Sequence, residues 1–144
     1  MAQPVIGLPV RHPKADDAEA LAVLMLDAYT GTIDFDESDT LDVARNEVGG
    51  YLSGSPMLEH GFLALDGGVP VAAVLVSWYE GNPLIGYVMT AAAHKGRGLA
   101  TALTTLALAS LHAAGEREVH LWVTRGNTHA ERIYERLGFR EIPG

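Results

Sequence analysis

The feature that most limits the fold of this chain is a pair of β-rich runs joined by a short glycine turn. Phe62–Leu65 and Val69–Tyr79 are mostly apolar, and Asp66-Gly67-Gly68 lies between them. Because glycine readily adopts the positive φ angles of a tight hairpin, these runs predict two antiparallel strands. A second turn, Glu80-Gly81-Asn82-Pro83, leads into a third β-rich run, Leu84–Thr90. The centre of the sequence therefore predicts an antiparallel meander.

Apolar residues recur with a helical period on both sides of this meander, which predicts helices before and after it. The other expected elements are an edge strand over Val5–Val10, a helix from Asp16 to Gly31, an acidic loop over Thr32–Thr40, a helix from Leu41 to a breaker at Ser53–Pro56, a helix from Leu99 to Gly115, a strand over Val119–Thr124, and a helix opened by a capping box of Thr128 and Glu131 and stopped by Gly138. This order predicts one mixed α/β domain over residues 1–144.

Composition narrows the functional classes. A chain of 144 residues that is 48% hydrophobic fits one packed domain, and its net charge of −8 argues against a protein that coats nucleic acid. The absence of cysteine excludes disulfides and a cysteine nucleophile, and the six histidines lack metal-ligand spacing, so we expect no metal site. No run approaches the ~20 apolar residues of a membrane span, and no signal peptide is recognisable, so we expect a cytoplasmic protein without a membrane partner.

The strongest candidate for a binding feature is the turn Ala93–Thr101, between the third strand of the meander and the following helix. It contains Gly96 and Gly98, with Lys95 and Arg97 interleaved. A glycine turn that opens a helix presents unpaired N–H groups at the positive end of the helix dipole, which favours phosphate. The turn matches neither a P-loop nor a dinucleotide fingerprint, because Thr101 stands where the latter has its third glycine. The alternative is a tight turn with two solvated basic residues.

Two motifs, taken together, resemble the GNAT superfamily of N-acetyltransferases. The family's first motif is Arg or Gln, then any two residues, then Gly, then any one residue, then Gly or Ala. Lys95, Gly98 and Ala100 stand at its three defined positions here. The second block is matched by Leu121-Trp122-Val123, Asn127, Ala130, Tyr134, Gly138 and Phe139. The resemblance covers nearly the whole chain, from Ala15 to Phe139. It implies a mixed, mainly antiparallel central sheet flanked by helices, with acetyl-CoA as the cosubstrate and an amine of a small molecule or peptide as the acceptor.

The resemblance also implies roles for individual residues. The backbone N–H groups of the glycine turn would bind the pyrophosphate, the preceding strand would pair with the pantetheine arm, and two residues of the last helix would contact the arm and protonate the leaving thiolate. The pyrophosphate would be bound by Lys95, Gly96, Arg97, Gly98, Leu99, Ala100 and Thr101, and the pantetheine arm would pair with Val88, Met89 and Thr90. Asn127 would contact the arm, and Tyr134 would protonate the thiolate. A backbone N–H near Val88 or Met89 would stabilise the developing oxyanion. Asn127 could instead be only a helix cap, and Tyr134 only a packing residue.

The sequence departs from the family pattern in three ways. Lys95 replaces the usual Arg or Gln, and the strand Leu84–Thr90 lacks the carboxylate that serves many relatives as general base. Glu80 is the nearest candidate base, with a chain of waters as an equal alternative. Only Arg140–Gly144 follow the last helix, so we expect a sheet shortened at its C-terminal end. A homodimer, or the segment Val5–Val10 folding back, would then protect the exposed edge.

The acidic loop is the remaining candidate for contact with the substrate. Asp34, Asp36 and Glu37 would line the acceptor side of the cleft and attract amines, the alternative being a solvated acidic loop. An N-acetyltransferase is therefore the leading hypothesis. A non-catalytic acyl-CoA-binding or regulatory module on the same fold is the alternative, and the missing base leaves it open. The sequence does not identify the acceptor amine.

Overall fold

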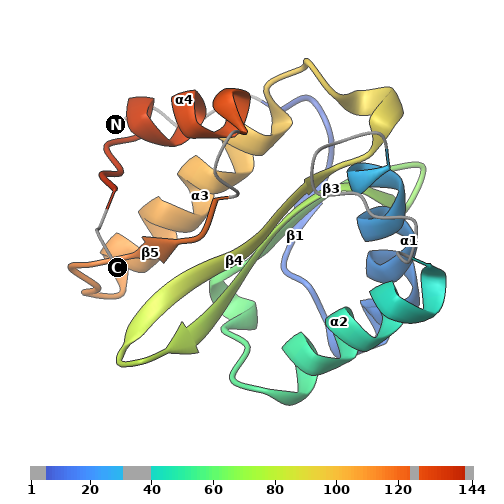
Figure 1. The fold of residues 1–144 in the computed structure, drawn as a ribbon, viewed down its shortest axis with the longest axis horizontal. Coiled ribbons are helices and arrows are strands. Elements are labelled where there is room, and N and C mark those ends of the chain that lie inside the picture. The colour runs from blue at the N-terminus through green and yellow to red at the C-terminus, as the bar shows by residue number, and fades with distance from the viewer. Residues whose placement is uncertain (1–5, 31–39, 124–126, 142–144) are drawn as a thin grey trace.

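The computed structural model describes residues 6–30, 40–123 and 127–141 and shows a five-stranded sheet covered by helices on both faces (Figure 1). The elements are β1 (Val10–Arg11), α1 (Ala18–Tyr29), α2 (Leu41–Ser53), β2 (Phe62–Asp66), β3 (Val69–Tyr79), β4 (Asn82–Thr90), α3 (Leu99–Ala113), β5 (His120–Leu121) and α4 (Thr128–Arg136), with 3₁₀ turns at Ala15–Asp17, Leu58–His60 and Ala92–His94. The strands lie in the order β1-β2-β3-β4-β5. The first four are antiparallel and β5 is parallel to β4, which confirms the mixed, mainly antiparallel sheet.

Alternate residues of the meander build two separate cores. On one face, Leu63, Ala73 and Leu75 pack with α1 and α2. On the other face, Val74 and Val76 pack with α3. This alternation follows from the two-residue period of a strand, and β3 is buried from Pro70 to Val76 because helices cover both of its faces there. None of the helices in the described ranges is long and apolar enough to cross a membrane.

A bulge at Gly86 interrupts the alternation on β4. Leu75 of β3 pairs with Tyr87, but the next residue, Val76, pairs with Ile85, so Gly86 has no partner. Residues two apart on a regular strand point to the same face, yet Ile85 packs with α3 whereas Tyr87 packs with α1 and α2. The unpaired glycine therefore turns the second half of β4 over relative to the first.

The N-terminal edge strand forms, but not as expected. It begins at Val10 and pairs with β2, with Val10 opposite Ala64. Because β1 lies at the edge opposite β5, the expectation that Val5–Val10 folds back over the β5 edge is wrong. Ile6, Leu8 and Val10 instead pack into the core beneath α3. Among the described residues, β5 pairs only with β4, over two residues rather than the six expected.

Candidate functional site

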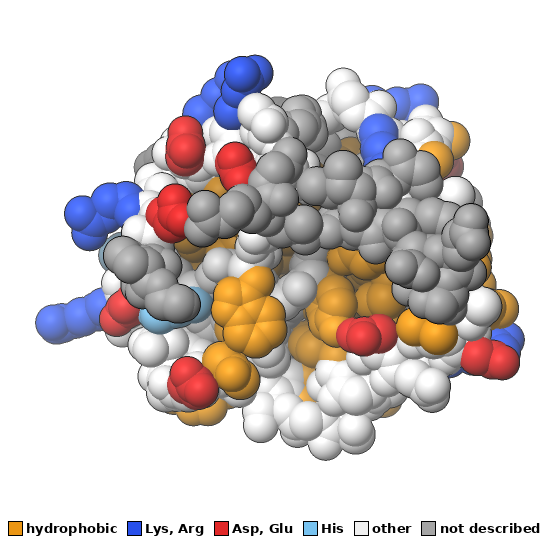
Figure 2. Space-filling view, viewed as in Figure 1, with side chains coloured by type: hydrophobic (Ala, Val, Ile, Leu, Met, Phe, Trp, Pro, Cys, Tyr) orange, Lys and Arg blue, Asp and Glu red, His pale blue; other side chains and the backbone are white. Residues whose placement is uncertain are grey.

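A cavity of about 1170 Å³ opens where β4 and the edge strand β5 separate. Its walls come from α1 and α2 on one side of the sheet, from the turn before α3 and the start of α3, and from the segment that contains β5 and α4. Hydrophobic side chains are exposed in a hollow near the middle of this face (Figure 2). The cavity thus lies at the junction of elements far apart in the sequence, as expected for a binding site.

The floor of the cavity is a strand edge. β5 pairs with β4 only at Leu84 and Ile85, immediately before the bulge, and the cavity is then lined by β4 from Gly86 to Thr90. Leu121, Trp122 and Val123 line the opposite wall, which shows that the two strands separate here. The backbone groups of β4 on this side have no strand partner among the described residues. Such groups can hydrogen-bond to an extended ligand that adds itself as a strand.

One end of the cavity is the glycine turn at the start of α3. Gly98 is the N-cap residue with φ +76°, and Gly96 has φ +81°, so both need the left-handed conformation that glycine provides. The first N–H groups of α3 have no partner within the helix, and its first turn contains no acidic residue. A Cβ at Gly96 or Gly98 would meet no described atom within 4 Å. The turn therefore offers open space and N–H donors to an anionic group.

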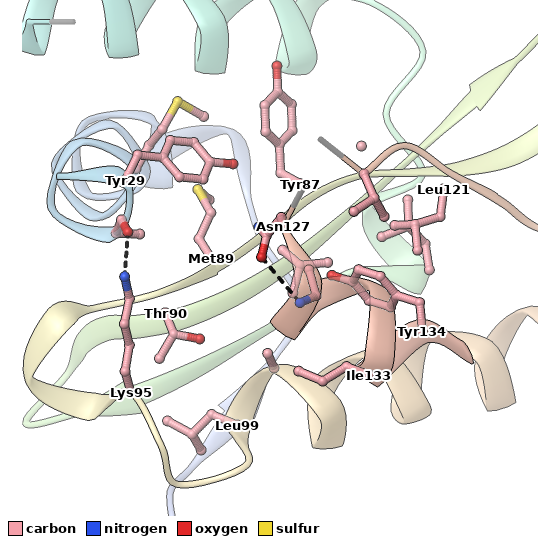
Figure 3. Close-up of a pocket in the computed structure, with 18 of the residues that line it drawn as sticks. Tyr29, Tyr87, Met89, Thr90, Lys95, Leu99, Leu121, Asn127, Ile133 and Tyr134 are labelled. Atoms are coloured by element: carbon pink, nitrogen blue, oxygen red, sulfur yellow. Dashed lines mark hydrogen bonds between the residues drawn. The ribbon is translucent and has the colours of Figure 1, made fainter. Parts of the chain in front are cut away.

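The two basic side chains of this turn do not point at that space. The Nζ atom of Lys95 donates a hydrogen bond to the Ala28 carbonyl oxygen at 2.7 Å, and so ties the turn to the last turn of α1 (Figure 3). Unpaired carbonyls and the negative dipole end attract a cation there. Arg97 is exposed and is not among the cavity residues. Neither side chain therefore reaches the open space above the two glycines in this structure, and binding of the cofactor by Lys95 and Arg97 stays a prediction.

Two of the expected site residues, Asn127 at the N-cap of α4 and Tyr134 within α4, line the cavity. Asn127 is the N-cap, because its Oδ1 accepts a hydrogen bond from the Ala130 N–H at 3.2 Å, so the helix starts one residue before the expected capping box. Asn127 also lines the cavity, and both of its expected roles stay open. Burial raises the pKa of Tyr134 to about 12, so its phenol stays protonated at neutral pH. Its ring packs edge-on against Phe139, and no described residue hydrogen-bonds to its hydroxyl.

Glu80 lies elsewhere. It occupies the hairpin turn between β3 and β4 with φ +48° and borders a separate hollow of about 130 Å³ near Trp122. From Asn82 to Gly86 the strand already extends roughly 13 Å, at about 3.3 Å per residue. Glu80 is therefore placed beyond the near end of β4 and not in the cavity, which argues against the expected general base. Asp34, Asp36 and Glu37 lie outside the described residues.

The carboxylate that does line the cavity was missed by sequence reasoning. Glu47 of α2 is the only acidic residue among the described cavity residues, and its Oε2 accepts a hydrogen bond from the Tyr87 hydroxyl at 2.6 Å. Burial, and then the nearby Glu47 carboxylate, raise the pKa of Tyr87. One face of α2 lines the cavity, and its residues recur at helical spacing: Thr40, Val43, Ala44 and Glu47. This spacing is the feature of the sequence that could have indicated Glu47. In the described ranges, no three His, Asp or Glu side chains cluster as metal ligands would.

Comparison with known proteins agrees with the motifs. Residues 22–139 match the family model described as the acetyltransferase (GNAT) family. A mycothiol acetyltransferase from Corynebacterium glutamicum is 49% identical over 47 residues, a stretch that is 33% of this chain and only 16% of that relative.

Solved structures match over much more of the chain. The structure of PH1933 from Pyrococcus horikoshii OT3 has a TM-score of 0.78 at 19% identity, over 95% of this chain and 91% of that one. The PaiA N-acetyltransferase from Thermoplasma acidophilum, in complex with coenzyme A, has a TM-score of 0.72 at 15% identity, over 94% and 91%. At these identities the likeness establishes the fold.

Proposed function

The chain belongs to the GNAT family of acetyltransferases, and from this premise we propose that it transfers the acetyl group of acetyl-CoA directly to an amine of a small molecule or peptide. The single observation that carries the proposal is the cavity at the separation of β4 and β5. It joins an unpaired strand edge, a helix N-terminus and a tyrosine hydroxyl in one space. Each of these suits a different part of the cosubstrate.

The residues present fit the pyrophosphate and the pantetheine arm of acetyl-CoA. Open space above Gly96 and Gly98 allows a pyrophosphate to approach the N–H groups at the start of α3. The backbone of Val88, Met89 and Thr90 lies along the cavity floor, where it can pair with the amides of a pantetheine arm. A Cβ at Gly86 would also meet no described atom within 4 Å, so the strand edge is open at the bulge.

Acetyl-CoA supplies an acetyl group activated as a thioester, and the chain's task is to stabilise the charges that develop during transfer. A backbone N–H of β4 near Val88 hydrogen-bonds to the thioester oxygen as it becomes negative. The neutral amine attacks the thioester carbon, its nitrogen loses one proton to water as the C–N bond forms, and the hydroxyl of Tyr134 donates to the sulfur as the C–S bond breaks. Because the pKa of Tyr134 is about 12, whereas a thiol ordinarily has a pKa of about 8.5, the phenol is the weaker acid. Its main effect is therefore a hydrogen bond to the departing thiolate, which then takes its proton from solvent.

A thiol-release assay with acetyl-CoA and a panel of primary amines tests the proposal, together with calorimetric titration of acetyl-CoA. We expect saturable binding and amine-dependent release of free thiol. Binding without release for any amine would instead favour the non-catalytic acyl-CoA-binding module. Absence of binding would overturn both.

A further inference from the structure

The side of the cavity opposite the glycine turn is acidic at one point and otherwise apolar. Glu47 lies there on α2, and Val43, Met25 and Leu26 line the same wall. The described cations of the cavity, Lys95 and Arg136, come from the turn before α3 and from α4. The lining is therefore polarised, with negative charge carried by α2.

Glu47 is held in place by Tyr87, which is itself packed against a buried tyrosine. Tyr87 donates its hydroxyl to Glu47 Oε2, and its ring meets Tyr51 edge-on, with centroids 6.2 Å apart. Tyr51 is buried and donates its own hydroxyl to the Val76 carbonyl oxygen at 2.8 Å. Figure 3 shows Tyr87 pointing from β4 toward α2. These successive contacts, from Val76 through the two tyrosines to Glu47, fix the position of the carboxylate relative to the sheet.

This arrangement exists because of the bulge. Without the unpaired Gly86, Tyr87 would share the face of Ile85, beneath α3, and Glu47 would have no phenol beside it. A carboxylate at the edge of a cavity is usually solvated and mobile, whereas a positioned one recognises a specific partner. Among the described residues only Tyr87 bonds to this carboxylate, and the bond uses one of its two oxygens.

We propose that Glu47, oriented by Tyr87, binds the ammonium group of the acceptor, and that the acceptor is a primary amine carried on an apolar or aromatic group. An ammonium ion matches a carboxylate that is already positioned, and it loses one proton to water before its neutral nitrogen attacks the thioester. The apolar wall around Met25 and Val43 suits the group that bears the amine. This assignment rests on the proposed function, because it places the acceptor across β4 from the acyl donor.

Calorimetry with 2-phenylethylamine as the probe, in the presence of saturating CoA, tests the subsite directly. We expect Glu47→Gln to weaken binding of 2-phenylethylamine at least tenfold and Tyr87→Phe to weaken it about threefold. The uncharged analogue 2-phenylethanol should bind both variants as it binds the parent. Asp42→Asn is the matched control, because it removes one charge from the same helix at a residue that does not line the cavity. It should leave binding unchanged.

Kinetics supply an independent readout. Glu47→Gln should raise KM for 2-phenylethylamine at least tenfold with a smaller change in kcat, and it should spare KM for aniline, which is uncharged at pH 7.5. Failure of the parent to bind 2-phenylethylamine, or equal affinities of the parent and Glu47→Gln, would overturn the subsite while acetyl-CoA binding remained. Loss of acetyl-CoA binding to the parent itself would overturn the proposed function instead.

Discussion

Replacement of Tyr134 by phenylalanine separates catalysis from packing more cleanly than any other change in the cavity. The Tyr134 ring packs against Phe139 with centroids 6.0 Å apart at 76°, and phenylalanine keeps this contact. The same two residues close the C-terminal cap of α4, where the Phe139 N–H donates to the Tyr134 carbonyl and the Gly138 N–H to that of Glu135. These are backbone bonds, so the substitution does not alter them.

The hydroxyl itself makes no hydrogen bond to a described residue, so its removal leaves no orphaned partner there. We therefore expect the free energy of unfolding to change by less than about 0.5 kcal/mol, as for substitutions that disturb no packing or hydrogen bond. If Tyr134 stabilises the departing thiolate, kcat should fall about 10²-fold, which corresponds to about 2.7 kcal/mol of lost transition-state stabilisation. Affinity for acetyl-CoA should change little, because the hydrogen bond forms only as the C–S bond breaks.

The assay is thiol release at saturating acetyl-CoA and amine, with urea unfolding and calorimetry on the same preparations. Tyr79→Phe is the control, because Tyr79 lies outside the cavity and beside Trp122, at a centroid distance of 5.2 Å. The pH profile of kcat should show no ionisation of Tyr134 below about pH 11, since the pKa of its phenol is about 12. A Tyr134→Phe variant that retains the parental kcat would refute the assignment and leave Tyr134 as a packing residue.

Three further predictions follow from the same structure. When Gly86 is replaced by Ala, Val and Leu in turn, the affinity for acetyl-CoA measured by calorimetry should fall progressively, and at least tenfold for Leu. The reason is that the added side chain enters open space at the bulge without a strained φ. Equal affinities would place the ligand elsewhere. Arg11 contacts the Asp17 carboxylate at 2.7 and 2.8 Å and holds the pKa of Asp17 below its usual range. The pair therefore stabilises the fold fully above about pH 4, and this stabilisation is lost as pH falls through the lowered pKa. Asp17→Asn should therefore cost about 1.5–3 kcal/mol in urea unfolding at pH 7 and much less near pH 2, and an equal cost at both would contradict the pairing. Because the outer edge of β5 is unpaired among the described residues and Trp122 near it is 65% exposed, we expect a homodimer by light scattering, and a monomer at all concentrations would exclude it.

The meander was predictable because its signals are local. β3 has the expected bounds, and β2 and β4 differ from expectation by at most two residues. Gly67, Gly68 and Gly81 all have positive φ, as the tight turns require. Local chemistry also fixes the ends of α3 and α4, where Gly115 and Gly138 adopt the left-handed conformation. A turn or a cap depends on neighbouring residues, which the sequence displays directly.

The edge strands were predicted less well because long-range partners determine them. Val119–Thr124 alternates like a strand, yet among its described residues only His120 and Leu121 pair, since β5 leaves β4 at the bulge. The N-terminal segment is apolar and broken by Pro4, Gly7 and Pro9, and nothing in that pattern states which edge it joins. The burial of Ile6 and Leu8 under α3 decides it. Periodicity thus identifies a strand but not its neighbour.

The sequence indicated the glycine turn and β4 at the proposed cosubstrate end but not Glu47 and Tyr87 at the proposed acceptor end, and the register of β4 explains the difference. The glycine turn is a continuous segment, so its N–H groups could be found from sequence, although the bond from Lys95 to Ala28 could not. The pairing of Tyr87 with Glu47 joins residues 40 positions apart and requires the single register shift at Gly86. A lone glycine within a strand pattern does indicate a bulge or a close approach. In the proposed function, the unpaired Gly86 opens the strand edge to the acyl donor and turns Tyr87 toward the Glu47 carboxylate. A change that restored regular pairing there should therefore disable both halves of the site together.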